Sequence, residues 1–189
     1  MKPKLIIAPT VEPVSLAEAK KHLNLYDDFT EDDDYIAGLI KVAREFGEDL
    51  TGWAFAEQTR EIYLDRFPNK KFIELRQYPL ISVTSFTVTD YTGNVTTLQP
   101  DTCYIVDTDS AFGRVVLPFG KAWPSMQLYP INPIKIRFVC GDVVRLPETY
   151  KQAMLVHVGL MYQYRESIPE KELQTIIRAY RSANCLRWW

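Results

Sequence analysis

The clearest helical pattern of the chain runs from Asp32 to Gly52. Apolar residues recur there at steps of three and four, which places them along one stripe of a helix. The stripe comprises Ile36, Leu39, Ile40, Ala43, Phe46 and Leu50. Asp32 to Asp34 predict the start, because carboxylates cap free N–H groups and suit the positive end of the helix dipole. Gly52 predicts a left-handed stop. Arg44 and Glu48 fall largely on the opposite side, and the apolar stripe needs a partner to bury it.

Three further helices are expected. The capping-box pattern Ser15-Leu16-Ala17-Glu18 predicts a short helix that ends near Leu23. Proline begins two more, at Pro147 and Pro169, where its missing N–H costs nothing. The segment from Ala153 to Met161 is apolar on nearly all sides, so this helix should lie in the middle of a helical core.

Between residues 53 and 146 the pattern changes to that of strands. Ile134 to Cys140 alternates apolar and polar side chains, as a half-buried strand does. Asp90 to Asn94 predicts a hairpin turn. Other short strands are expected at 59–67, 71–75, 83–89, 95–98, 104–106 and 113–117. A long loop follows from Pro118 to Pro133.

These patterns predict an α+β fold with a helical core built from both ends of the chain. Residues 1–52 would supply its N-terminal part, and residues 147–189 its C-terminal part and a tail. Residues 53–146 would form an inserted antiparallel β element. We expect helix 32–51 to pack against helix 148–165, because the second helix is the apolar partner that the first requires.

Composition is that of a soluble globular protein. Of the 189 residues 47% are apolar and 24% charged, and the formal net charge is −2. The net charge is therefore too small to attract nucleic acid or a membrane electrostatically. No stretch approaches the roughly 20 apolar residues that span a bilayer. The three cysteines are widely spaced, which favours reduced thiols in a cytoplasm-like compartment. Acids gather from Asp27 to Asp34, whereas only arginines are charged after Leu173.

No catalytic or metal-binding pattern emerges, so we expect neither an enzyme nor a cofactor. His22 and His157 lie far apart and lack the spacing of a zinc site. His157 is expected in the core, and His22 suits the C-terminal end of its helix. Asp32 to Asp34 are expected to cap a helix, and Asp107 and Asp109 to shape a turn, rather than to bind a cation.

Several short motifs follow one another in a characteristic order. The first two are Pro13 to Leu23 and Asp33 to Gly52. They are followed by Leu64 to Pro68, Tyr78 to Val83, Gly113 to Val115, Cys140 to Asp142, Leu146 to Glu148, and Ile176 to Arg181. In this order and spacing the chain resembles the head–tail connector, or head-completion, proteins of long-tailed double-stranded DNA bacteriophages. One departure is Ala179, where the family pattern has proline.

The resemblance implies a structural adaptor of the virion neck, assembled in the host bacterial cytoplasm. Such adaptors form a ring of about a dozen copies beneath the portal protein after DNA packaging, through heterologous contacts that close on rotation. They extend the DNA channel and meet the next neck or tail-completion protein. A nearly neutral chain suits a channel through which DNA passes without tight or sequence-specific binding, because many cationic phosphate contacts would hold the DNA.

Three groups of residues are expected to form interaction surfaces. The tail would dock on portal or on the adjacent copy through Arg178, Arg181, Arg187, Trp188 and Trp189, because tryptophan and arginine are strong interface anchors. Acids that include Asp28 and Asp32 would face a neighbouring subunit. The long loop would meet the next neck component or line the channel through Phe119, Lys121, Trp123 and Tyr129.

Alternatives stay open at this point. The chain could be another ring-forming virion part, such as a tail terminator or a tail-tube protein, although those are mainly β. A metal-dependent nuclease would use Asp32 to Asp34, or Asp107 with Asp109, yet no positioned base accompanies these acids. Trp188 and Trp189 could stack on nucleic acid bases instead of docking on protein.

Overall fold

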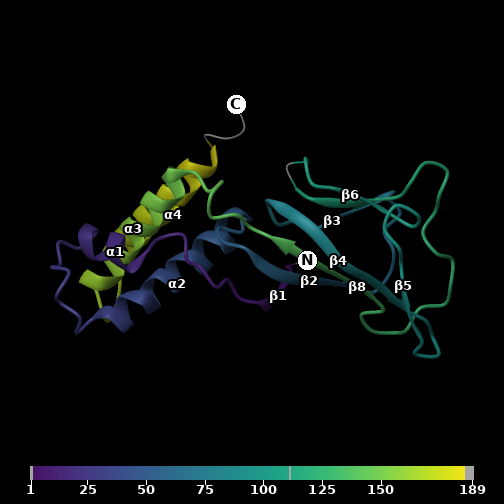
Figure 1. Cartoon of the computed structure of the whole chain (residues 1–189), viewed down its shortest axis with the longest axis horizontal. Coiled ribbons are helices and arrows are strands. Elements are labelled where there is room, and N and C mark those ends of the chain that lie inside the picture. The colour runs from purple at the N-terminus through teal and green to yellow at the C-terminus, as the bar shows by residue number, and fades with distance from the viewer. Residues whose placement is uncertain (1, 111, 186–189) are drawn as a thin grey trace. The chain divides into compact units, whose positions relative to one another are not determined.

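A computed structural model describes residues 2–110 and 112–185. These residues form two compact units, each with its own interior (Figure 1). The β unit contains residues 2–9 and 57–141, and the helical unit contains residues 10–56 and 142–185. Four helices and two antiparallel sheets confirm the predicted α+β class.

The helical unit is built from both ends of the chain. Its helices are α1 (Leu16–His22), α2 (Asp33–Thr51), α3 (Glu148–Gln163) and α4 (Glu170–Cys185). The capping box at α1 forms as expected: Ser15 Oγ accepts the Glu18 N–H at 3.2 Å, and Glu18 Oε2 accepts the Ser15 N–H at 2.7 Å. Gly52 ends α2 with φ 74°, the left-handed conformation that glycine adopts without strain.

The apolar stripe of α2 is buried against α3 and α4, which lie side by side (Figure 1). Tyr180 of α4 is fully buried, and its hydroxyl donates to the Ala43 carbonyl at 2.9 Å. Its ring lies 5.9 Å from that of Phe46 and 6.3 Å from that of Phe55, measured between centroids. Helix α2 therefore packs against α3, as predicted, and also against α4.

A buried ion pair lies on the side of α2 opposite the apolar stripe. Arg44 and Glu48 are 3% and 2% exposed, and their side chains meet at 3.2 Å. Arg44 also contacts Glu12 at 2.8 Å, while Glu48 accepts the Phe55 N–H at 2.8 Å. The sequence pattern places this pair opposite the apolar stripe but does not reveal its burial, which arises because segments before and after α2 cover that side and satisfy both charges.

The β unit contains two antiparallel sheets. The larger has the order β1-β2-β8-β4-β5 and the smaller the order β3-β7-β6. Their bounds are β1 Lys4–Ile7, β2 Gln58–Leu64, β3 Phe72–Glu74, β4 Leu80–Thr89, β5 Val95–Thr97, β6 Ile105–Asp107, β7 Arg114–Val116 and β8 Ile134–Cys140. Strand β8 lies at the centre of the larger sheet and keeps the predicted alternation of buried and more exposed residues.

The unit boundaries differ from the predicted ranges at both junctions. Residues 2–9 belong to the β unit rather than to the helical part, because β1 pairs antiparallel with β2. Residues 53–56 belong to the helical unit, because the rings of Trp53 and Phe55 pack against Tyr150 at centroid distances of 5.6 and 5.0 Å. Within the described residues, no helix is both long and apolar enough to span a bilayer.

Two glycines of α2 separate the effect of helix propensity from that of packing. A Cβ at Gly47 would lie 2.6 Å from ring atoms of both Phe55 and Tyr180, whereas a Cβ at Gly38 would meet nothing within 4 Å. We expect Gly47→Ala to lower the free energy of unfolding by about 1–3 kcal/mol through overpacking. Gly38→Ala should raise it by about 0.5–1 kcal/mol, as alanine does at an open helical position. Urea unfolding of both variants checks this, and equal effects would contradict it.

His157 of α3 makes the helical unit sensitive to acid. It is buried beside Tyr180, whose hydroxyl oxygen is 3.4 Å from Nδ1, and burial lowers the pKa of His157 from 6.5 to about 4. Between these pH values the unfolded chain binds a proton that the folded protein does not. Stability is therefore lost as pH falls from about 6.5 to about 4, by up to about 3 kcal/mol in total.

Replacing this histidine tests the acid sensitivity. His157→Gln should flatten the dependence of the unfolding free energy on pH between 7 and 5, whatever its effect on absolute stability. His22→Gln, at the other and exposed histidine, is the matched control and should keep the native slope. Urea titrations at a series of pH values measure both slopes, and an unchanged slope in His157→Gln would refute the assignment.

Candidate interaction surfaces

The loop between α1 and α2, residues 23–32, is acidic and prominent. Asp27 and Asp28 are exposed, and in the described part of the chain neither side chain has an ion-pair partner. Tyr26 is 82% exposed. Asp28, one of the predicted interaction residues, is therefore available to a partner. We call residues 23–32 the α1–α2 loop.

Asp32 is engaged within the chain. Its carboxylate accepts the Tyr162 hydroxyl at 2.5 Å and the Arg165 guanidinium at 2.6 Å. The Arg165 guanidinium also lies 5.0 Å from the ring centroids of both Tyr35 and Tyr162. The Tyr162 hydroxyl, with the Arg165 charge, holds the pKa of Asp32 below its usual range. Asp32 joins the start of α2 to the end of α3.

The prediction that the Asp32 carboxylate caps the free N–H groups of α2 is therefore wrong. Asp32 occupies the N-cap position of α2, but its side chain makes no capping hydrogen bond. Tyr162 and Arg165, about 130 residues away, take the carboxylate instead. Asp33 pairs with the Lys20 ammonium at 3.0 Å. A local pattern of acids before a helix cannot reveal that a distant segment competes for them.

The arginines of α4 face away from the helical core. Ile176, Tyr180 and Ala183 are buried on one side of α4, whereas Arg178 and Arg181 are exposed on the other. No ion pair holds either arginine among residues 2–110 and 112–185. The remaining predicted tail residues, Arg187, Trp188 and Trp189, lie outside the described residues.

The long loop divides into an exposed and a structural part. Phe119, at full exposure, Lys121 and Tyr129 face solvent. Trp123 is half-buried: its Nε1–H donates to the Lys70 carbonyl at 2.9 Å, and its ring stacks on Phe67 with centroids 5.2 Å apart. Of the four predicted residues, Trp123 therefore holds the loop to the segment between β2 and β3, and the other three are accessible.

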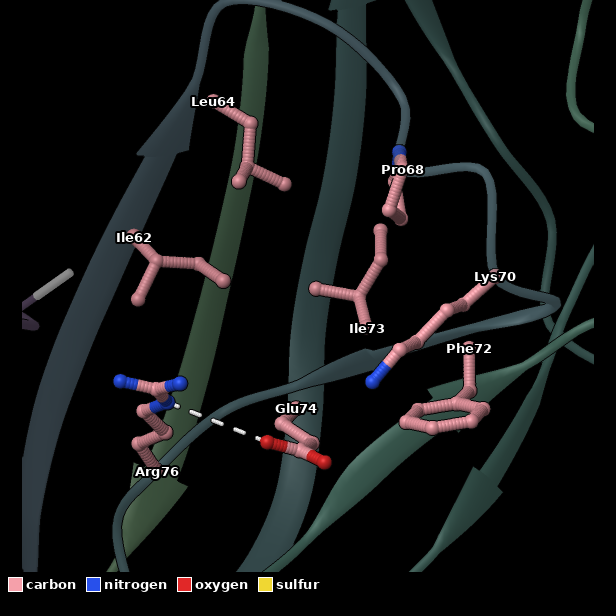
Figure 2. A pocket seen from close by; sticks show the side chains of 8 residues that line it. All are labelled: Ile62, Leu64, Pro68, Lys70, Phe72, Ile73, Glu74 and Arg76. Carbon is pink, nitrogen blue, oxygen red and sulfur yellow. Dashed lines mark ion pairs between the residues drawn. The ribbon is translucent and has the colours of Figure 1, made fainter.

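A pocket between β2 and β3 was not foreseen from the sequence. Its volume is about 220 Å³, and it lies where the strand β2, the loop after it and the edge strand β3 meet (Figure 2). Apolar side chains line one part and charged side chains another. The lining consists of Ile62, Leu64, Pro68, Lys70, Phe72, Ile73, Glu74 and Arg76. We call this the β2–β3 pocket.

The charged side chains of the β2–β3 pocket make only weak contacts with one another. Arg76 pairs with Glu74 at 3.8 Å, and both side chains are more than 40% exposed, so the pair contributes little. The Lys70 ammonium lies 5.3 Å from the ring centroid of Phe72. No sequence signal marks this site, because β2 and β3 belong to different sheets and their facing does not follow from either pattern.

The carboxylate of Asp107, one of the acids considered as a metal ligand, is occupied by turn contacts. Hydrogen bonds from the Ser110 hydroxyl and the Arg114 guanidinium hold the pKa of Asp107 at about 2. Asp107 also accepts the Asp109 N–H at 3.1 Å, as the turn prediction requires. Within the described ranges, no group of three His, Cys, Asp or Glu side chains is placed to hold a metal ion.

Known proteins resemble the chain in sequence pattern and in fold. The model of a family described as phage gp6-like head-tail connector protein matches residues 13–111, more than half of the 189 residues. A chain from the neck of the empty gene transfer agent (GTA) particle, computed with C6 symmetry, superposes with TM-score 0.78 at 19% identity, covering 95% of each chain. A chain from the virion of the native GTA particle gives 0.76 at 20% identity, again over 95% of each.

A third solved structure is that of a neck computed with a different symmetry. A chain from the neck of the native GTA particle, computed with C12 symmetry, superposes with TM-score 0.74 at 18% identity, covering 95% of this chain and 94% of that chain. Such identities show a shared fold. No curated protein sequence matches the chain.

Two aromatic residues of the long loop test its division into structural and accessible parts. Trp123→Ala should lower the free energy of unfolding by about 2 kcal/mol, because a half-buried ring and its hydrogen bond are lost. Phe119→Ala is the matched control and should change stability by less than about 0.5 kcal/mol. Chemical denaturation followed by circular dichroism measures both. A larger loss for Phe119→Ala than for Trp123→Ala would reverse the assignment.

Proposed function

The chain belongs to the phage gp6-like head–tail connector family, and we propose from this premise that it is a structural protein of a virion neck. The observation that carries the proposal is the family match, together with a fold shared over 95% of the chain with proteins of GTA necks. The family is one of structural connectors, which supports a role without catalysis.

We propose that copies of the chain form a ring. The related neck protein belongs to a particle whose neck was computed with C12 symmetry, which supports about a dozen copies around one axis. A ring of this kind needs two different patches on each copy, one to meet the copy before it and one to meet the copy after it. The helical unit exposes carboxylates on the α1–α2 loop, and the β unit exposes a cation on the long loop. Each copy therefore carries two different patches, as such contacts require.

The proposed partners are the portal protein and the next neck or tail-completion protein. Arg178 and Arg181 leave an exposed cationic stripe on α4, which suits docking on portal together with the residues after Cys185. Phe119, Lys121 and Tyr129 are exposed aromatic and cationic side chains of the long loop, which suit contact with the next component. Arginine and aromatic side chains are the usual anchors of such contacts.

DNA is proposed to pass through the ring without tight binding. The net charge of −2 gives no strong attraction to phosphate. The tail-terminator and tail-tube alternatives lack support, since the family match is to connectors. The nuclease alternative is not favoured either, because Asp32 and Asp107 are both taken up in hydrogen bonds within the chain.

Electron microscopy of the protein mixed with the portal protein of the same virus or prophage tests this function. Class averages should show a ring with a central hole stacked on the portal. Copies that stay single at high concentration and that do not bind portal would overturn the proposal.

Two variants in the same experiment test the α4 docking surface. A chain ending at Cys185, and separately Arg178→Glu with Arg181→Glu, should weaken portal binding about tenfold or more, as loss of interface anchors does. Lys41→Glu with Arg145→Glu, exposed elsewhere on the helical unit, is the matched control. Portal binding at native strength by both docking variants would rule this surface out.

A further inference from the structure

We propose that the β2–β3 pocket of one copy receives Tyr26 and the acids beside it from the α1–α2 loop of the adjacent copy. The proposal rests on the proposed ring and names the contact between neighbours. Neither the family match nor the fold comparison assigns a role to this pocket or to this tyrosine.

The size and lining of the pocket fit one large side chain rather than a metabolite. Its volume is about 220 Å³, below the roughly 300–1,000 Å³ of small-molecule sites. Ile62, Leu64 and Ile73 give it an apolar wall, and Pro68 closes one end (Figure 2). An aromatic ring inserted there would bury apolar surface on both partners, which is the main favourable term in association.

The rim of the pocket favours an anionic partner. Lys70 and Arg76 contribute two cationic groups, against the single carboxylate of Glu74. The long contact between Arg76 and Glu74 leaves the guanidinium free to exchange its partner. Carboxylates placed next to an inserted ring would therefore meet both cations at close range.

The α1–α2 loop carries that combination of groups. Tyr26 is 82% exposed, and Asp27 and Asp28 follow it directly with exposed carboxylates. Tyrosine is a frequent interface anchor, because its ring is large and rigid and its hydroxyl tolerates a wet edge. The loop thus presents an aromatic anchor beside two carboxylates, and the pocket presents an apolar wall beside two cations.

The base of the loop is held in place before any partner arrives. The Phe29 N–H donates to the Tyr26 carbonyl at 3.1 Å, which closes a turn. The Lys20 ammonium donates to the Asp27 carbonyl at 3.0 Å and also pairs with Asp33 at 3.0 Å. A loop that is ordered in the free protein loses less conformational entropy on binding.

The two surfaces lie on different units, so the contact is of the type that makes rings. The loop belongs to the helical unit and the pocket to the β unit. Each copy therefore offers one loop and one pocket, and pairing the loop of one copy with the pocket of the next is heterologous. Repeated around an axis, this contact uses every loop and every pocket once.

Charge reversal on each side tests the pairing. Lys70→Glu with Arg76→Glu gives a pocket variant, and Asp27→Lys with Asp28→Lys gives a loop variant. Each variant alone should need at least about tenfold more protein to form rings, because like charges then face each other across the contact. Lys4→Glu with Lys135→Glu, exposed on the β unit outside the pocket, is the matched control and should assemble as the native chain does.

Mixing the two variants decides whether the contact joins neighbours. The reversed loop of one variant fits the reversed pocket of the other, and the native loop of the second fits the native pocket of the first. An equimolar mixture should therefore recover ring formation in alternating order, whereas either variant alone should not. Recovery only when all four substitutions are placed in one chain would place the contact within a chain and overturn the proposal.

An uncharged substitution guards against misfolding of the charge variants. Tyr26→Ala should weaken assembly by a similar factor, and Tyr91→Ala, at another exposed tyrosine, should not. Sedimentation velocity of concentrated protein and electron microscopy with portal give the readout, with circular dichroism to check folding. Native assembly by the pocket, loop and Tyr26 variants would overturn the pairing and leave the ring proposal standing. Absence of rings with native protein even when portal is present would overturn both.

Discussion

The close approach of Tyr180 to Gly47 holds the helical unit together. Because residue 47 has no side chain, the Tyr180 ring reaches the backbone of α2, and its hydroxyl bonds the Ala43 carbonyl at 2.9 Å. The same ring meets Phe55, just beyond α2, and His157 of α3. One side chain near the end of the chain thus joins α4 to segments more than 100 residues earlier. This packing also directs Arg178 and Arg181 to solvent.

A second constraint is electrostatic. Arg44 bridges Glu12 and Glu48, and Glu48 binds the backbone after α2. A buried pair of this kind gives little net stability, yet breaking it leaves a buried charge without a partner. Its effect is to fix the chain entering the helical unit against the chain leaving it. The helical period could not show this, because the period orders residues within one helix and says nothing of the segments that cover its polar side.

Features that depend on a few neighbouring residues could be predicted from the sequence, whereas features that depend on contacts between distant segments could not. The capping box at Ser15, the stop at Gly52 and the alternation along β8 each follow from a few neighbouring residues, and each is present. Strand β1 was missed as part of the sheet, because its pairing with β2 joins residues more than 50 positions apart. For the same reason Asp32 was given a capping role, and the β2–β3 pocket was not foreseen. Among the proposed interaction surfaces, the exposed residues of loops and helices could be predicted from the sequence, but the β2–β3 pocket could be identified only from the structure.

The proposed contacts suit a neck protein whose assembly awaits the portal. Exposed ion pairs contribute little individually and are screened within about 8 Å at physiological salt, so a contact of two acids, two cations and one aromatic anchor is weak between free copies. Copies that first dock on a portal are held at a high effective concentration, which converts each neighbour contact into a nearly intramolecular one. Weak lateral contacts and stronger docking through α4 would then order the two events, with ring closure following attachment. The same weakness would limit premature rings of free copies, and a nearly neutral chain would let DNA pass once the proposed ring has closed.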